Sequence, residues 1–143
     1  MTERGDFLLV SVGRRRVGLR LVDVIEVADL GEVHAVPFSE PSLRGVSPAK
    51  GSLVPVVHLG ALLASESCPG ERPTVGVLAM AGGTMVCFEV DDADVVTSGT
   101  LRPVPPGEMM PWALAVVQVD DDLVPILNLN TLRDRLAEAG TRS

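Results

Sequence analysis

The sequence has very few aromatic side chains and almost no lysine. Its 143 residues include three Phe, one Trp and no Tyr, and Lys50 is the only lysine. The net charge is −7, and the only basic cluster is residues 14–16 (RRR). Proteins that bind nucleic acid usually combine a basic surface with stacking aromatic side chains. The composition therefore argues against nucleic-acid binding.

The chain also lacks the segments that would direct it into or across a membrane. No apolar run reaches the roughly eighteen residues of a membrane-spanning helix, and the first residues, MTERGD, lack a signal-peptide pattern. Cys68 and Cys87 have no partner-like spacing. We therefore expect a cytoplasmic protein with reduced thiols and no direct membrane insertion.

Motifs for catalysis, cofactor binding and metal binding are missing as well. The sequence has no phosphate-binding loop, no nucleophile elbow and no Cys-x-x-Cys pair. Residues 91–94 and 120–122 are acidic but lack the ligand spacing of a calcium loop. His58 has no evident carboxylate or nucleophile in register, so we expect it at the surface or between structural units. We predict a non-enzyme without cofactor or metal.

What the sequence does contain is an aliphatic core and an internal repeat. Apolar residues make up 46%, which supports a core for one domain, and the abundance of Val favours strands. Residues 53–62 (LVPVVHLGAL) align without a gap with residues 123–132 (LVPILNLNTL), and five of the ten positions are identical. Residues 7–27 align with residues 76–96 at a constant offset of sixty-nine. Two copies are too few for a solenoid, so we expect two like units that bury a shared face.

The boundary between the copies lies at residues 65–73 (SESCPGERP), the one segment with the composition of a linker. We assign residues 7–64 to a first β-barrel unit and residues 74–139 to a second within one domain, and leave open an exchange of strands between them. The segments 33–37 (VHAVP) and 101–105 (LRPVP) also correspond.

Hydrophobic alternation and turn residues predict the elements of each unit. Hairpins are expected at 7–22 and 74–90, and a third at 112–129 with its turn at 120–122. Pro55 and Pro125 lie inside apolar strands, so each must occupy an edge or a bulge, where a bend helps a short sheet to close. Short helices are expected at 39–43, 60–67 and 130–139, the last one capped by Asn130.

In order and spacing these pieces resemble the CheW family, the coupling proteins of bacterial chemosensory arrays. Residues 6–27 (DFLLVSVGRRRVGLRLVDVIEV) are similar to the family's first hairpin with its V-x-E-V ending. Residues 42–59 (SLRGVSPAKGSLVPVVHL) are similar to its G-V-x-N-x-R-G-x-x-x-P-V-x-D-L segment. Val90-Asp91 and residues 123–132 resemble the counterparts in the second half.

The resemblance implies a mainly β fold of two SH3-like five-stranded β-barrel subdomains, related by a pseudo-two-fold duplication around an apolar seam, with short helices including a C-terminal one. It implies a non-catalytic adaptor at cytoplasmic receptor arrays. The implied partners are the tip of a methyl-accepting chemoreceptor, the regulatory domain of a CheA-type histidine kinase, and other CheW-like domains.

Six partner-binding residues follow from the same resemblance. Val24, Glu26 and Val27 fall on the receptor-facing strand, and Val75 falls at a position that lines the groove between the barrels. Lys50 and Gly51 fall on the family's R-G. The competing interpretation is that the three valines are ordinary core residues.

Three departures from the family pattern favour an alternative assignment. Pro48 replaces the asparagine of N-x-R-G, Lys50 replaces its arginine and so lacks a bidentate fork, and His58 replaces the aspartate of D-L. The alternative is a divergent accessory protein, in a gliding or other non-flagellar pathway, that binds the receptor but binds the kinase weakly or not at all. An unrelated small-ligand-binding or enzymatic double barrel would need a polar pocket between the units.

Overall fold

The computed structural model describes residues 4–12, 15–29, 33–34, 43–59, 75–107, 112–131 and 134. This part of the chain is mainly β, as predicted. Its elements in order are β1 (Arg4–Val12), β2 (Arg15–Arg20), the 3-10 turn η1 (Leu21–Asp23), β3 (Val24–Asp29), β4 (Leu43–Ala49), β5 (Ser52–His58), β6 (Val75–Ala81), β7 (Thr84–Val90), β8 (Asp92–Thr100), β9 (Ala113–Val119) and β10 (Asp122–Leu127).

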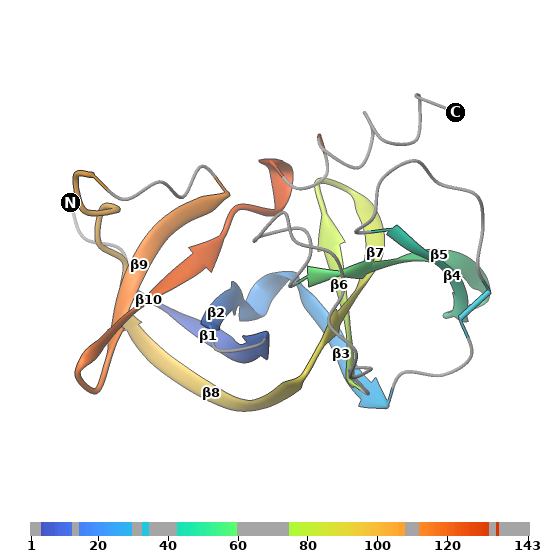
Figure 1. Cartoon of the computed structure of the whole chain (residues 1–143), viewed down its shortest axis with the longest axis horizontal. Helices are drawn as coiled ribbons and strands as arrows, with labels where there is room; N and C mark the ends of the chain where they lie inside the picture. The colour runs from blue at the N-terminus through green and yellow to red at the C-terminus, as the bar shows by residue number, and fades with distance from the viewer. Residues whose placement is uncertain are drawn as a thin grey trace.

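The predicted repeat is present in the strands themselves. An offset of sixty-nine residues carries β1, β2 and β3 onto β6, β7 and β8, and an offset of seventy carries β4 and β5 onto β9 and β10. The strands form two five-stranded sheets, in the orders β8-β1-β2-β10-β9 and β3-β6-β7-β5-β4, which lie side by side (Figure 1). Each sheet therefore combines a hairpin from one copy with three strands from the other copy.

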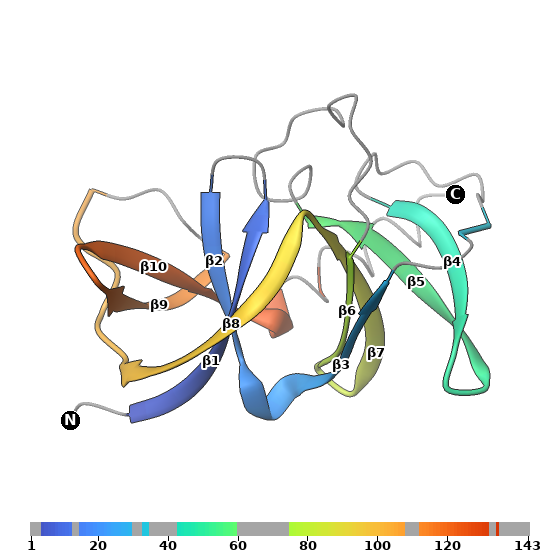
Figure 2. The ribbon, with the colours of Figure 1, turned by 90° about the horizontal axis from the view of Figure 1, so that it is seen from below.

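Short connectors explain why the copies exchange strands. If β8 lay beside β6 of its own copy, it would run parallel to β7 on the far side of β6. The chain would then have to return along the whole strand length between β7 and β8, which takes a crossover of about a dozen residues. Only Asp91 separates β7 from β8, and only η1 separates β2 from β3. The chain must instead continue forward into the other sheet, and in Figure 2 β8 crosses in front of β1 and β2. The NH of Asp91 donates to the carbonyl of Ser11, which fixes this junction on β1.

Both sheets close into barrels through a pair of matching bridges. His34 and Val46 exchange two backbone hydrogen bonds of 2.8 and 3.0 Å, which join the segment after β3 to β4. Arg102 and Val116 exchange bonds of 2.8 and 2.9 Å, which join the segment after β8 to β9. The predicted correspondence of 33–37 with 101–105 therefore marks the closing point of each barrel. Each bridge closes its sheet at one point only, and β3 itself still pairs with β6 alone.

The two strand prolines occupy the positions that their chemistry allows. Pro55 pairs with Val46 of β4, but the parallel pairing of β5 with β7 begins only at the next residue, Val56. Pro125 likewise precedes Ile126, where β10 first pairs with β2. Each proline therefore lies where its strand has a single neighbour, and the missing NH costs no ladder hydrogen bond.

The apolar core has a seam between the barrels and a smaller cluster inside each barrel. Val54, Val56, Leu78 and Cys87 fill one interior, and Phe7, Val117 and Ile126 fill the other. The seam cluster is itself duplicated, because seven of its residues in copy one recur in copy two at the repeat offsets. The pairs are Leu8 and Val77, Val10 and Ala79, Val12 and Ala81, Val17 and Val86, Leu19 and Phe88, Val57 and Leu127, and Leu59 and Leu129.

The helix predictions are tested only at the C-terminal end. Residues 129–131 and 134 are helical, and the NH of Thr131 donates to Asn128 Oδ1 at 3.3 Å. The helix therefore begins at 129, and the cap is Asn128 rather than the predicted Asn130. The predicted helix at 60–67, and the one at 39–43 apart from Leu43 in β4, lie outside the described residues, as does the helix beyond Asp134.

Candidate functional site

Strand β3 forms one edge of its sheet, and its register with β6 decides where the predicted site residues point. Val24 pairs with Ala79 and Val27 with Val77, and Asp29 pairs with Val75. Directly paired residues of antiparallel strands project to the same face. Ala79 and Val77 belong to the seam cluster, so Val24, Val27 and Val75 all lie on the seam side of this ladder.

The three valines differ in how far they enter the seam. Val24 and Val75 are half-buried and pack against the seam cluster. Val27 is 40% exposed. Val24 and Val75 are thus partly core residues, whereas Val27 presents an apolar surface at the edge of the seam.

Glu26 points away from the seam and meets Lys50. A bulge between Val24 and Glu26 shifts the register, so that Glu26 pairs with Leu78, whose side chain lies in the barrel interior. Lys50 Nζ lies 2.8 Å from Glu26 Oε2, and both side chains are about half exposed. The pair connects the edge strand β3 to the β4–β5 turn. The structure therefore brings together two residues that the sequence places twenty-four positions apart.

The β4–β5 turn imposes an unusual backbone on Lys50. Its φ is 51° and that of Gly51 is 77°, as in a two-residue hairpin turn with both central residues left-handed. Glycine adopts this conformation freely. The space where a Cβ of Gly51 would lie is open, so the turn favours glycine here for its backbone conformation and not for its small size. Lysine is a poor choice at such a position, at a cost of about 1 kcal/mol.

Removing the Glu26–Lys50 ion pair is expected to change stability little. Exposed ion pairs contribute at most about 1 kcal/mol, and Asn tolerates a positive φ better than Lys does. We expect Lys50→Asn to leave the free energy of unfolding within about 0.5 kcal/mol of the wild type, as measured by urea denaturation. Glu26→Gln is the matched variant, because it removes the charge of the other partner of the ion pair. A loss above about 2 kcal/mol in either would contradict an exposed pair.

An exposed apolar surface beside these residues was not predicted. It consists of four large side chains of η1 and β3, and we name it the β3 strip: Leu21, Val22, Ile25 and Val27. Val22 is 81% exposed. Exposed apolar side chains that cluster in this way commonly mark an interaction site. The signal in the sequence is the run of residues 22–27 (VDVIEV), which has apolar residues on both faces and therefore fits either a bulged strand or a fully buried one. The structure has the bulge, between Val24 and Glu26. Ile25 and Val27 stay exposed because β3 is an edge strand.

The β3 strip continues into an open cavity at the end of the other barrel. The cavity has a volume of about 520 Å³ and includes Leu21 and Val22 in its wall. Arg4, Arg20 and Asp6 line it together with Leu101. The wall of this cavity therefore carries both apolar and charged side chains.

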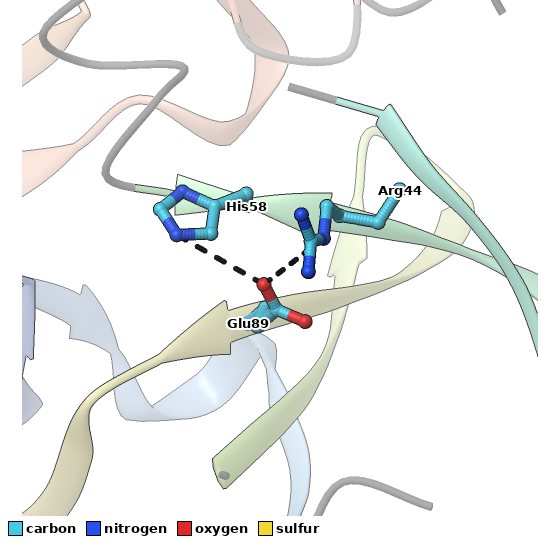
Figure 3. Close-up of polar contacts among 3 residues, drawn as sticks. All are labelled: Arg44, His58 and Glu89. Carbon is cyan, nitrogen blue, oxygen red and sulfur yellow. Dashed lines mark ion pairs between the residues drawn. The ribbon is translucent and has the colours of Figure 1, made fainter. Parts of the chain in front are cut away.

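His58 lies inside a buried ionic cluster rather than at the surface. His58 Nε2 is 3.9 Å from Glu89 Oε1, and Arg44 Nε is 3.4 Å from the same oxygen (Figure 3). The exposed fractions are 7% for the His58 side chain, 4% for Glu89 and 27% for Arg44. Because β5 pairs with β7 in parallel, the carboxylate in register with His58 comes from the other copy of the repeat. Of the two predicted locations, the one between units is the one observed.

The same cluster affects Cys87, a buried free thiol two residues before Glu89. Burial, and secondarily the charge of Glu89, raises the pKa of the Cys87 thiol from 9.0 to about 11. The thiolate is the reactive form of cysteine, so the raised pKa and the burial together keep Cys87 unreactive at neutral pH.

The raised pKa predicts a loss of stability in alkaline solution. Below pH 9 the Cys87 thiol is protonated in the folded and the unfolded protein, so its contribution to the free energy of unfolding is fully present. As the pH rises from 9 to 11 only the unfolded thiol ionises, and the folded state loses no more than about 2 kcal/mol. Urea denaturation between these pH values should show this extra slope in the wild type and not in Cys87→Ala. Equal slopes would contradict the assignment.

The described residues offer neither a metal site nor a membrane-spanning helix. No group of three or more His, Cys, Asp or Glu side chains in this part of the chain could hold a metal ion. Within the same residues, no helix has the length and apolar character needed to cross a bilayer.

Comparison with known proteins agrees with the duplicated barrels. The family model described as "CheW-like domain" matches residues 6–137, most of the chain. The chain belongs to the CheW-like domain family. The predicted family and its two-barrel fold are thereby confirmed.

Two relatives describe how far this CheW-like domain has diverged. A curated "Chemotaxis protein CheW" from Klebsiella aerogenes is 25% identical over 103 residues, which cover 70% of this chain and 62% of the relative. The match therefore spans less than two thirds of that protein's length. The crystal structure of the scaffolding protein TtCheW from Thermoanaerobacter tengcongensis superposes with a TM-score of 0.77 over 87% of this chain and 89% of that one, at 18% identity. At that identity the likeness supports the fold alone.

Proposed function

We propose that this chain is a non-catalytic adaptor that couples methyl-accepting chemoreceptors to a CheA-type histidine kinase in a cytoplasmic chemosensory array. The observation that carries the proposal is the β3 strip, an exposed apolar surface on an edge strand beside the Glu26–Lys50 pair. Apolar anchors spaced along such a surface suit an amphipathic helix, which would be the receptor tip. Membership in the CheW-like domain family and the curated chemotaxis relative support the same assignment.

The receptor arm of the proposal can be tested with two valines that the repeat makes equivalent. Val27 lies on β3, and Val96 occupies the corresponding position on β8 and is 57% exposed. A charge on an apolar anchor typically costs 1–2 kcal/mol or more. We expect Val27→Asp to weaken binding of a receptor tip fragment at least tenfold in a calorimetric titration, and Val96→Asp to leave it unchanged. Equal effects of the two variants would overturn the assignment of the strip.

A second candidate, the accessory protein that binds the kinase weakly, is favoured by the turn of β4 and β5. Lys50 provides one ammonium group, already 2.8 Å from Glu26, in place of the planar guanidinium fork that a carboxylate can bind in two places. Titration with the kinase regulatory domain decides between the two candidates. Micromolar or tighter binding supports the coupling protein, and Lys50→Arg should strengthen binding if the missing fork limits it. No measurable binding, with receptor binding intact, supports the accessory protein.

A further inference from the structure

The buried ionic cluster occurs in only one of the two barrels. Glu89, Arg44 and His58 have equivalents in the other barrel at the repeat offsets, and these are Arg20, Leu114 and Asn128. Glu89 is therefore replaced by a residue of opposite charge, and Arg44 by an apolar residue. This difference lies where a hairpin of one copy meets three strands of the other copy.

The repeat makes these parts interchangeable in shape. Each copy consists of a hairpin (β1–β2 or β6–β7) followed by an arm of three strands (β3–β5 or β8–β10). Each barrel joins the hairpin of one copy to the arm of the other copy. Two chains could build the same pair of barrels from two first copies, or from two second copies, because the strand order and the seam residues correspond.

Charge separates the observed pairing from the pairing of like copies. In the observed barrel, Arg44 and His58 both lie close to the carboxylate of Glu89. If the first arm met the first hairpin, Arg44 and His58 would face Arg20 with no carboxylate at that position. If the second arm met the second hairpin, Glu89 would be buried against Leu114 and Asn128 with no cation. An uncompensated buried charge is strongly destabilising.

In the observed pairing, the positive charge of Arg20 lies at a position that tolerates it. Arg20 is partly exposed and lines the open cavity at the end of its barrel. The buried carboxylate thus faces two basic side chains and the guanidinium of Arg20 lies at an open cavity, a combination that neither pairing of like copies provides.

We infer that the charges at positions 20, 44 and 89 select the pairing of unlike copies, which one chain can satisfy by itself, and exclude the pairing of like copies, which would join two chains. The short connectors require each arm to join another hairpin but leave open whether that hairpin is the unlike one of the same chain or the like one of a second chain. The ionic cluster makes that choice. The charges therefore prevent a hairpin from pairing with the corresponding arm of a second molecule of this protein.

Two variants of the full chain test the inference by exchanging and then restoring the charges. In Arg20→Glu/Glu89→Arg, the first arm faces a cation within its own chain and a carboxylate on the first hairpin of another chain. In Arg20→Glu/Arg44→Glu/Glu89→Arg, all three signs are reversed, and the original preference returns. Each protein is unfolded in urea and refolded at high protein concentration, and its mass is measured by size exclusion with light scattering.

The wild type and the triple variant are expected at the mass of one chain, 15.1 kDa. The double variant is expected at twice that mass or more, or to fail to refold, and the triple variant must then recover both the mass and a cooperative transition. A double variant that refolds with the mass and midpoint of the wild type would overturn the inference. A triple variant that refolds no better than the double would overturn it equally, because charge sign would not be what matters.

Discussion

Replacing Phe88 with Ala is expected to lower the free energy of unfolding by about 3–5 kcal/mol, one of the largest effects of any single substitution in this chain. Phe88 is fully buried in the seam and pairs with Val57 on one side and Val77 on the other. Removing its ring loses the transfer free energy of the apolar atoms and leaves a cavity that the surrounding strands cannot fill. Because the seam joins both barrels, the loss should destabilise the whole chain cooperatively.

The repeat supplies the control for this prediction. Leu19 occupies the equivalent position in the first copy and is also fully buried in the seam. Phe88→Leu makes the two positions alike and should cost only about 1–1.5 kcal/mol. Urea denaturation followed by circular dichroism gives both values, and the slope against urea should stay constant if unfolding remains two-state. A biphasic transition in Phe88→Ala would show that the barrels unfold separately, contrary to a shared seam.

Arg44→Ala is expected to cost about 2–4 kcal/mol, although the residue is polar and partly exposed. The substitution removes the guanidinium partner of the buried Glu89, and of the described ion-pair partners it leaves the more distant imidazole of His58. Among the described residues none donates a hydrogen bond to Glu89 Oε1, so charge is what compensates its burial. The value falls slightly below the usual range for a buried ion pair because 27% of the Arg44 side chain is exposed.

Leu114→Ala at the equivalent position of the second copy is the matched control. Leu114 is 43% exposed and truncation to Ala should cost less than about 1 kcal/mol. The difference between the two variants, measured by urea denaturation at low and high salt, isolates the ionic cluster. A buried pair is screened little by salt, so the cost of Arg44→Ala should persist at high salt. A cost that disappears at high salt would identify a surface interaction instead.

Local patterns were enough to predict the strands and the repeat. Alternating apolar residues and glycine turns define the hairpin at 74–90, and the prolines at 55 and 125 indicate positions with a single neighbour, as found. The correspondence of 33–37 with 101–105 also marks equivalent points of both barrels. These features depend on residues close in the chain, where side-chain periodicity and backbone restrictions act directly.

Some errors arose where a residue's surroundings come from the other copy. His58 shows no carboxylate nearby in the sequence, because Glu89 reaches it only through the parallel pairing of β5 with β7. Residues 22–27 have the composition of a buried strand, yet Ile25 and Val27 are exposed because β3 forms the edge of its sheet. The lengths of the connectors were a usable signal for the exchange, since a single residue between β7 and β8 forbids a parallel return.

The sequence by itself determined that this protein is a duplicated, aliphatic, mainly β chain of the CheW-like type, because hydrophobic period, turn residues and repetition are properties of the linear chain. The tertiary structure decided which copy each hairpin joins, which valines of the β3 region stay exposed, and that Arg44, His58 and Glu89 meet. Those outcomes depend on contacts between segments from about thirty to more than one hundred residues apart, such as His58 with Glu89 and Gly18 with Ile126. Burial and charge compensation act only after such segments have paired, so the residue pattern within a strand does not record them.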